Sequence, residues 1–277
     1  MEIDANNGAR LVLKVPLVNL GNTGLKVSKL GFGEVDFGDK DPLRLRPKEG
    51  WRILPESYKL GVNFWDSSDD YATHPLGASA LKLLPRKDVV ISYKTSAKSG
   101  KEASRSLRNF LKELDTDYID VFLLHCVSSD WMKGCRGMLE ELNGKKAAGM
   151  VGAIGLSTHS VTVVREAAQI EEVDVILTIC CNASTAVINK YIPIEDGTIR
   201  EMYTAIKLAH ENGKGTIAMK ILGGRVTGPA PTLVKNYQYS IGSIARLDFV
   251  DAMFVGMSNL DEVKKNIQAV LSAKALQ

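Results

Sequence analysis

Eight short apolar runs that alternate with stretches of helical spacing constrain the fold of this chain more than any other feature. Each run has the length and apolar character of a buried strand. The stretches between them carry apolar residues three and four positions apart, as on one face of a helix. Between residues 102 and 114 these are Leu107, Phe110, Leu111 and Leu114. The runs expected as strands cover residues 28–33, 62–66, 89–94, 119–125, 151–157, 175–182, 216–221 and 252–257.

Eight strand–helix units in a chain of 277 residues predict an α/β fold, the (β/α)8 TIM barrel, in which eight parallel strands close into a ring. A doubly wound sheet is the alternative, but its phosphate-binding turn has the pattern G-x-G-x-x-G after the first strand. Here the first strand is followed by G-E-V-D-F-G, which lacks the third glycine at that spacing. The turn residues from Gly21 to Gly24 predict an N-terminal β-hairpin over residues 10–27. We expect a single barrel domain over residues 1–277.

The composition is that of an ordinary globular protein, with 45% hydrophobic and 24% charged residues. A net charge of +3 and the lack of a basic run argue against a nucleic-acid partner. No apolar run reaches the roughly 20 residues that span a membrane, and the amino terminus does not resemble a signal peptide. We therefore expect no membrane partner and a cytoplasmic location. The four cysteines lack C-x-x-C spacing and are expected to be reduced.

Four residues with acid–base side chains lie at or just beyond the ends of three consecutive predicted strands. They are Asp66 and Tyr71, Lys94, and His125. Each alone has an ordinary structural explanation, as a helix cap, a core aromatic, a solvated strand end or a hydrogen-bonded core histidine. In a barrel, however, neighbouring parallel strands bring their carboxyl ends to one rim, where the chemistry of such folds is found. The four side chains are therefore expected to share one small volume.

The physical chemistry of such a cluster indicates proton transfer. An ammonium close to a phenol would lower the pKa of Tyr71, and a carboxylate at Asp66 would hold Lys94 charged. Tyr71 could then act as a general acid nearer neutral pH than a free phenol, whose pKa is about 10. A neutral His125 could orient a carbonyl oxygen. Because no side chain donates hydride, reduction of that carbonyl would require a nicotinamide or a flavin.

These residues stand in segments that resemble the aldo-keto reductase family over nearly the whole chain. The matching segments are L-G-F-G near Leu30, G-V-N-F-W-D-S-S-D-D-Y, I-S-Y-K, D-T-D-Y-I-D-V-F-L-L-H, G-A-I-G-L-S-T-H, A-M-K-I-L-G-G and V-G-M-S-N-L-D-E-V-K-K-N-I. The resemblance implies a TIM barrel and NAD(P)H-dependent reduction of a small-molecule aldehyde or ketone. It also implies a catalytic tetrad, which maps onto Asp66, Tyr71, Lys94 and His125.

The same resemblance implies a cofactor site around the rim of the barrel. Ser157 and Thr158 stand where the family binds the carboxamide of the nicotinamide. NADP is the first expectation, and NAD is the alternative because Glu262 stands where many members have an arginine for the 2′-phosphate. The complete set expected at the cofactor is Gly33, Asp66, Ser157, Thr158, Asn182, Met219, Lys220, Leu222, Gly223, Gly256, Ser258, Asn259, Glu262 and Asn266.

Three other functions stay open at this point. A metal-dependent hydrolase would use histidines and carboxylates at strand ends, but no H-x-H follows the first strand, and we expect no metal site. A Schiff-base lyase could use Lys94 or Lys220, yet it leaves Asp66 and Tyr71 without a role. A cofactor-binding regulatory subunit with little or no turnover lies outside the enzyme class. The sequence makes no prediction of oligomeric state.

Overall fold

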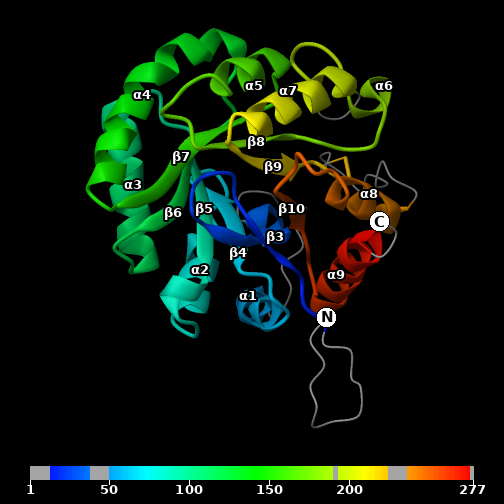
Figure 1. Ribbon diagram of the computed structural model, residues 1–277. Coiled ribbons are helices and arrows are strands. Elements are labelled where there is room, and N and C mark those ends of the chain that lie inside the picture. The colour runs from blue at the N-terminus through cyan, green and yellow to red at the C-terminus, as the bar shows by residue number, and fades with distance from the viewer. Residues whose placement is uncertain (1–12, 38–49, 190–192, 224–235, 275–277) are drawn as a thin grey trace.

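Eight parallel strands close into a barrel in the order β10-β3-β4-β5-β6-β7-β8-β9. The structure is a computed structural model and describes residues 13–37, 50–189, 193–223 and 236–274. The barrel strands are β3 (Leu30–Gly33), β4 (Phe64–Ser68), β5 (Val90–Thr95), β6 (Ile119–Leu124), β7 (Val151–Thr158), β8 (Val175–Ile179), β9 (Gly215–Met219) and β10 (Ala252–Gly256). Each predicted strand is present, and the predicted TIM barrel is confirmed (Figure 1).

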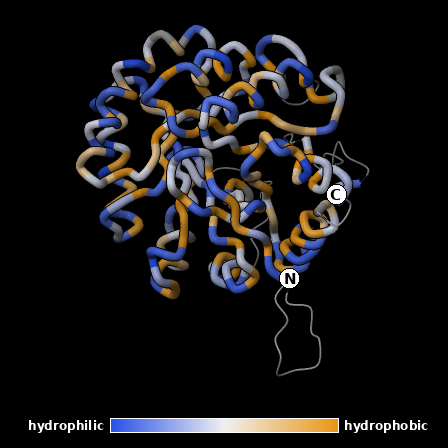
Figure 2. Tube along the Cα trace, viewed as in Figure 1, coloured by the Kyte–Doolittle hydropathy of each residue, from blue (hydrophilic) through white to orange (hydrophobic). Residues whose placement is uncertain are grey.

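Helices follow the strands and surround the ring (Figure 1). They are α1 (Gly50–Lys59), α2 (His74–Leu81), α3 (Gly100–Leu114), α4 (Ser129–Ala147), α5 (Val161–Ala167), α6 (Thr185–Ile188), α7 (Ile199–Glu211), α8 (Tyr237–Ala245) and α9 (Leu260–Lys274). Short 3-10 helices η1 (Glu34–Phe37) and η2 (Arg86–Asp88) precede α1 and β5. Hydrophobic and hydrophilic residues alternate along most helices (Figure 2), as expected for helices that bury one face.

Helix α3 shows how local sequence sets such an element. The hydroxyl of Ser99 caps its first turn by accepting a hydrogen bond from the Glu102 amide. Its apolar face includes Leu107, Phe110 and Leu114, which are buried as their spacing predicts. Beyond Leu114 the chain leaves the helix through Asp115, which has a left-handed backbone (φ 53°).

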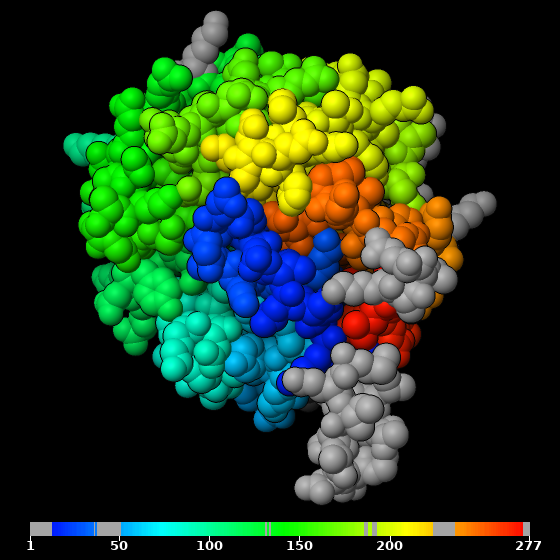
Figure 3. Space-filling view, in the orientation of Figure 1, coloured from blue at the N-terminus to red at the C-terminus, as the bar shows by residue number. Residues whose placement is uncertain are grey.

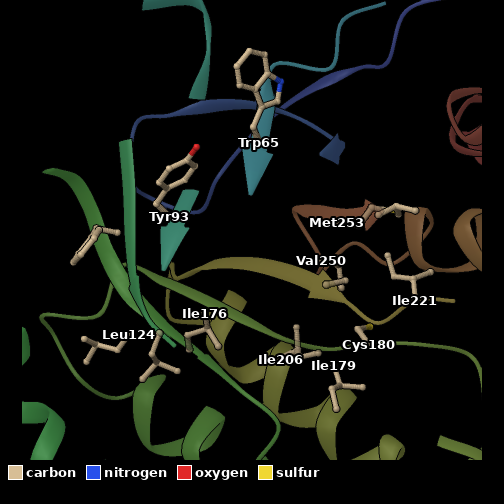
Figure 4. Close-up of a cluster of buried hydrophobic side chains, with 14 of the residues drawn as sticks. Trp65, Tyr93, Leu124, Ile176, Ile179, Cys180, Ile206, Ile221, Val250 and Met253 are labelled. Carbon is tan, nitrogen blue, oxygen red and sulfur yellow. The ribbon is translucent and has the colours of Figure 1, made fainter. Parts of the chain in front are cut away.

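Side chains alternate between the inside and the outside of the barrel along each strand. Phe64, Val90 and Val121 belong to the cluster that fills the barrel interior. Trp65 and Tyr93 belong instead to the larger core between strands and helices (Figure 4). This alternation decides which polar residues near the strand ends face the barrel axis.

The predicted hairpin is confirmed, with β1 (Leu17–Asn19) paired antiparallel to β2 (Lys26–Ser28); residues 10–12 of the expected span lie outside the described residues. Leu20 and Val27 are fully buried and pack into the barrel interior. The Gly21 amide donates a hydrogen bond of 2.9 Å to Asp251, just before β10. The hairpin, blue in Figure 3, lies across the face that the N-terminal strand ends share. The opposite end of the barrel is therefore the one available for a site.

Among the described residues, no helix has both the length and the apolar character needed to cross a membrane.

Candidate active site

Asp66 and Lys94 form a buried ion pair at the C-terminal ends of β4 and β5. The alternation along the two strands turns both side chains inward, on the same faces as Phe64 and Val90. The Lys94 ammonium donates to both carboxylate oxygens of Asp66, each at 2.5 Å. Burial lowers the pKa of Lys94, but Asp66 and Tyr71 raise it by more, so that the net pKa lies above the ordinary value. Lys94 is therefore a fixed positive charge near neutral pH.

Tyr71 and His125 complete the cluster predicted from the sequence. Tyr71 lies in the turn after β4, where its amide bonds the Ser68 carbonyl at 3.0 Å. The Lys94 nitrogen lies 4.9 Å from the centre of the Tyr71 ring, within range of a cation–π contact. The His125 ring meets the Tyr71 ring nearly edge-on, with centroids 5.7 Å apart. All four side chains thus meet at one place on the rim, although they come from three strand ends.

His125 is held as a neutral imidazole. Burial lowers its pKa to about 4, and the nearby Lys94 ammonium lowers it too, against the opposing effect of Asp70. Its Nδ1 atom lies 3.0 Å from the Ser68 hydroxyl and 3.4 Å from a carboxylate oxygen of Asp70. A neutral imidazole has one N–H donor, and the partner of Nδ1 decides whether that donor is Nδ1 or Nε2.

Asp69 ties the loop that carries Tyr71 to the neighbouring strand end. Its carboxylate accepts hydrogen bonds from the Ser96 amide at 3.1 Å and the Thr95 hydroxyl at 2.7 Å. Carboxylate and imidazole atoms of Asp69, Asp70 and His125 lie within 4.8 Å of one another, close enough to ligate a metal ion. The carboxylate oxygens of Asp69, however, already accept hydrogen bonds from backbone and hydroxyl donors, so we assign Asp69 a structural role.

Sequence reasoning missed Ser68, Asp70 and His159. Ser68 could have been found, because it follows Asp66 by two positions on a strand and must face the same side. Asp70 precedes Tyr71 in a turn, where no periodicity indicates its direction. His159 follows β7, and burial, with Lys220 nearby, lowers its pKa to about 4. It adds a second neutral imidazole near the end of the barrel.

Gly33 and Gly256 leave one side of the rim without side chains. Gly33 ends β3 and Gly256 ends the adjacent strand β10, and the two glycines lie opposite each other in the strand pairing. On its other side Gly33 lies opposite Asp66 of β4. A Cβ atom at Gly33 would meet nothing nearer than the Gly256 amide and the Val255 backbone, both at 3.4 Å. Two paired glycines beside Asp66 give a flat ligand room to approach the backbone.

The expected carboxamide-binding residues differ in how far their polar groups are already used. The Ser157 hydroxyl accepts a bond of 2.9 Å from the Cys126 amide, which leaves its own proton to donate. The buried Thr158 hydroxyl donates to the Val127 carbonyl at 2.6 Å and accepts from the Ser160 amide. Asn182 lies exposed after β8, and its side-chain oxygen accepts from the Ser240 hydroxyl of α8 at 2.9 Å.

The turn after β9 holds Met219, Lys220, Leu222 and Gly223. Met219 is half-buried at the strand end and pairs in register with Ile179 of β8. Lys220 has a positive φ of 60°, Gly223 one of 86°, and the Gly223 amide closes the turn on the Lys220 carbonyl at 2.8 Å. Left-handed backbone at both positions turns the chain sharply at the rim.

Glu262 folds back over the first turn of α9. Its carboxylate accepts from the Ser258 amide at 2.7 Å, the Ser258 hydroxyl at 2.9 Å and the Asn259 side chain at 3.2 Å. Asn259 in turn caps the Glu262 amide at 2.9 Å. The donors at this helix terminus, a type of site that binds anions, are thus already used by the chain's own carboxylate. Asn266 lies buried one turn further on.

The rim therefore suits a nicotinamide dinucleotide in chemistry as well as in space. Paired glycines lie beside Asp66, a cationic turn follows β9, and polar side chains cluster at the start of α9. A family model settles the relationship: the aldo/keto reductase family matches residues 29–240. The chain belongs to the aldo/keto reductase family. The expected class, an NAD(P)H-dependent oxidoreductase, is thereby confirmed.

Relatives of this aldo-keto reductase agree in fold and class. It is 27% identical to an L-galactose dehydrogenase of Arabidopsis thaliana, over 95% of this chain and 90% of that one. It is 24% identical to an NADH-specific methylglyoxal reductase of Escherichia coli, over 70% and 67%. A Pseudomonas aeruginosa protein assigned to the aldo-keto reductases superimposes with a TM-score of 0.76 at 25% identity, over 96% and 98% of the two chains.

Proposed function

We propose that this aldo-keto reductase reduces an aldehyde or ketone to an alcohol with Tyr71 as the proton donor. The observation that carries the proposal is the buried Lys94 ammonium, 2.5 Å from Asp66 and 4.9 Å from the centre of the Tyr71 ring. A positive charge fixed beside a phenol stabilises the phenolate that remains once the proton has left. The same charge in solvent would be far less effective.

Proton delivery would come from this chain alone. A reduced nicotinamide, when bound, supplies the hydride that no side chain can donate. Tyr71 would transfer its proton to the carbonyl oxygen, which becomes the hydroxyl of the product. Lys94 would then compensate the charge left on the phenolate, and Asp66 would keep Lys94 in position. Asp66 is thus a positioning residue for Lys94, and Tyr71 is the acid.

His125 would orient the substrate oxygen through its Nε2–H group. Ser68 is the nearer partner of Nδ1, at 3.0 Å against 3.4 Å for Asp70. Asp70 also accepts a hydrogen bond from the Ser96 hydroxyl. If Ser68 donates to Nδ1, the single proton of a neutral imidazole lies on Nε2, where it can donate to a carbonyl oxygen. The low pKa of His125 keeps it from competing with Tyr71 as the acid.

The cofactor would be held by the rim residues expected from the sequence, and we propose NADH as the preferred form. Ser157 and Asn182 would bind the nicotinamide end, Lys220 the pyrophosphate, and Ser258 and Asn259 the adenosine end. Glu262 repels a 2′-phosphate and already uses the donors that would bind one, whereas a carboxylate can accept a bond from a ribose hydroxyl. On these grounds we propose NAD, the alternative expected from the sequence, in place of NADP, the first expectation. The relative named as NADH-specific supports the same choice.

A second function deserves a test because of one similarity. Over 122 residues the chain is 36% identical to a rice protein named as a voltage-gated potassium channel subunit beta, covering 39% of this chain and 36% of that one. That likeness supports the alternative of a cofactor-binding regulatory subunit. The four polar side chains gathered at the rim favour turnover instead.

A carbonyl-compound screen followed by the absorbance of the reduced cofactor tests the proposal. Small aldehydes, ketones and sugar-derived carbonyl compounds would be offered with NADH and with NADPH. We expect cofactor oxidation with at least one compound class, faster with NADH. Tight cofactor binding without oxidation across the whole panel would support the regulatory alternative.

A further inference from the structure

Glu34 is a buried carboxyl group with no role in the reaction described so far. It begins η1, directly after Gly33 at the end of β3, and its solvent exposure is 0%. Among the described residues, neither of its carboxyl oxygens has a hydrogen-bond partner. Burying a charged carboxylate without partners costs several kcal/mol, so such groups usually bind a proton instead. Glu34 therefore requires an explanation.

Two of the titratable groups around Glu34 belong to the proposed catalytic cluster. η1 packs against β4 and β10. Asp66 of β4 and Lys94 and Tyr93 of β5 are the titratable groups close enough to interact with Glu34, and the sequence of β10 has none. Because Lys94 already donates to both oxygens of Asp66, an ionised Glu34 would add a second negative charge within electrostatic range of this pair.

The nearest hydroxyl does not compensate for that excess charge. Thr73 lies close enough to favour ionisation of Glu34, yet its hydroxyl is 2.5 Å from that of Ser67 and completes no bond to Glu34. Burial is the dominant effect, and it raises the pKa of Glu34 well above its ordinary range. Burial without hydrogen-bond partners and the neighbouring Asp66 carboxylate thus both favour the protonated form of Glu34.

We propose that Glu34 is a positioning residue of the reduction: an uncharged acid at neutral pH, whose ionisation at alkaline pH adds a negative charge within electrostatic range of the Asp66–Lys94 pair and opposes ionisation of Tyr71. While uncharged, it leaves Asp66 as the carboxylate that compensates Lys94, so that Lys94 can act on the phenol. Once ionised, it would keep Tyr71 protonated to higher pH, because two like charges resist forming close together.

The first test measures folding stability against pH for wild type, Glu34→Gln and the control Glu140→Gln, an exposed position on α4. In the unfolded chain Glu34 ionises near its free pKa of about 4.3, whereas in the folded chain it keeps its proton. The wild type therefore loses stability as pH rises from about 4 toward the folded pKa. Glutamine mimics the protonated acid, so Glu34→Gln should melt at a higher temperature at pH 7, and the gain should vanish near pH 4. The control should follow the wild type.

The second test compares the pH dependence of kcat/KM for the same three proteins. This second test rests on the proposed role of Tyr71, whereas the stability test does not, so the two tests can fail separately. We expect neutral-pH activity within about threefold of wild type, because glutamine keeps the shape and charge of the acid. In Glu34→Gln, the alkaline pH at which activity is lost should be lower than in the wild type by about half a pH unit or more, because the negative charge of ionised Glu34 no longer opposes ionisation of Tyr71.

Either of two results would overturn the inference. A stability difference that is absent or independent of pH would show that Glu34 is ionised in the folded protein. If kcat/KM of Glu34→Gln falls at the same alkaline pH as that of the wild type, whether or not neutral-pH activity is kept, then Glu34 has only a structural role. If Glu34→Gln does not fold, the infrared band of a protonated carboxyl in the wild type, expected at pH 7 and lost at alkaline pH, gives the same decision.

Discussion

Single side chains at the rim differ in how much of their hydrogen-bonding capacity is already used. Lys94 gives two bonds to Asp66, and the Thr158 hydroxyl both donates and accepts within the protein. Ser157 keeps its hydroxyl proton. Residue type and strand ends indicated Lys94 and Asp66 from the sequence, whereas Ser157 and Thr158 were expected only from the family resemblance. Their partners could not be predicted, because a hydrogen bond depends on loop geometry that periodicity does not record.

Replacing Ser68 by alanine tests the proposed state of His125. Without the serine donor, Nδ1 should take the proton and donate it to Asp70, so that Nε2 can no longer donate to a carbonyl oxygen. A lost hydrogen bond of about 1 kcal/mol predicts a fall in kcat/KM of roughly fivefold to tenfold. Nitrogen NMR of the His125 ring should report the move of the proton from Nε2 to Nδ1. Ser79→Ala on the exposed face of α2 is the control. An unchanged tautomer would refute the role given to Ser68.

At the scale of strands and helices, aspartates near the other end of the barrel fix neighbouring strands to one another. Asp120 accepts from the Ile91 amide at 2.9 Å, and Asp174 accepts from the Ile154 amide at 2.8 Å. Asp251 accepts from the amides of Thr216 and Gly21, each at 2.9 Å, and so joins β9, β10 and the hairpin. Conservation of such residues in a barrel would indicate stability rather than catalysis.

Asp251→Ala should destabilise the fold by about 3 kcal/mol, because it leaves two backbone amides without their charged acceptor. Activity per folded molecule should stay within about twofold, since the site lies at the other end of the barrel. Urea unfolding at pH 7 measures the effect. Asp248→Ala, at an exposed position three residues earlier, should change stability by less than about 0.5 kcal/mol. Equal effects of the two substitutions would contradict this reading.

The proposed preference for NADH depends on Glu262, in the first turn of helix α9. Glu262→Gln should strengthen NADPH binding about fivefold, as expected from removal of about 1 kcal/mol of charge repulsion, and leave the Kd for NADH within twofold. Fluorescence titration with both cofactors provides the comparison. Asp261→Asn, which removes a neighbouring charge that pairs with Lys265 at 2.6 Å, is the matched control. If the wild type already prefers NADPH, Glu262 does not have the proposed role.

Across the whole molecule, the sequence predicted the parts that depend on period and order along the chain. The strand–helix alternation indicated the barrel, and the ends of β4, β5 and β6 indicated the rim where Asp66, Lys94 and His125 meet. The burial of Glu34 was not predictable, because its side chain follows the end of β3, where no repeat constrains direction. The turning back of Glu262 from the first turn of α9 onto Ser258 depends on the geometry of the preceding turn, which the sequence pattern does not give. Only the closed barrel shows which strand ends are neighbours, and therefore which side chains lie next to one another at the rim.

We propose that Tyr71, a phenol beside a buried ion pair, donates the proton in carbonyl reduction. The most direct measurement is the turnover of wild type and Tyr71→Phe with the same carbonyl compound, together with the Kd of the reduced cofactor for both. We predict that Tyr71→Phe loses at least about a hundredfold in kcat, the range of general acid catalysis, while its cofactor Kd stays within about threefold. Turnover by Tyr71→Phe equal to that of the wild type would exclude Tyr71 as the proton donor.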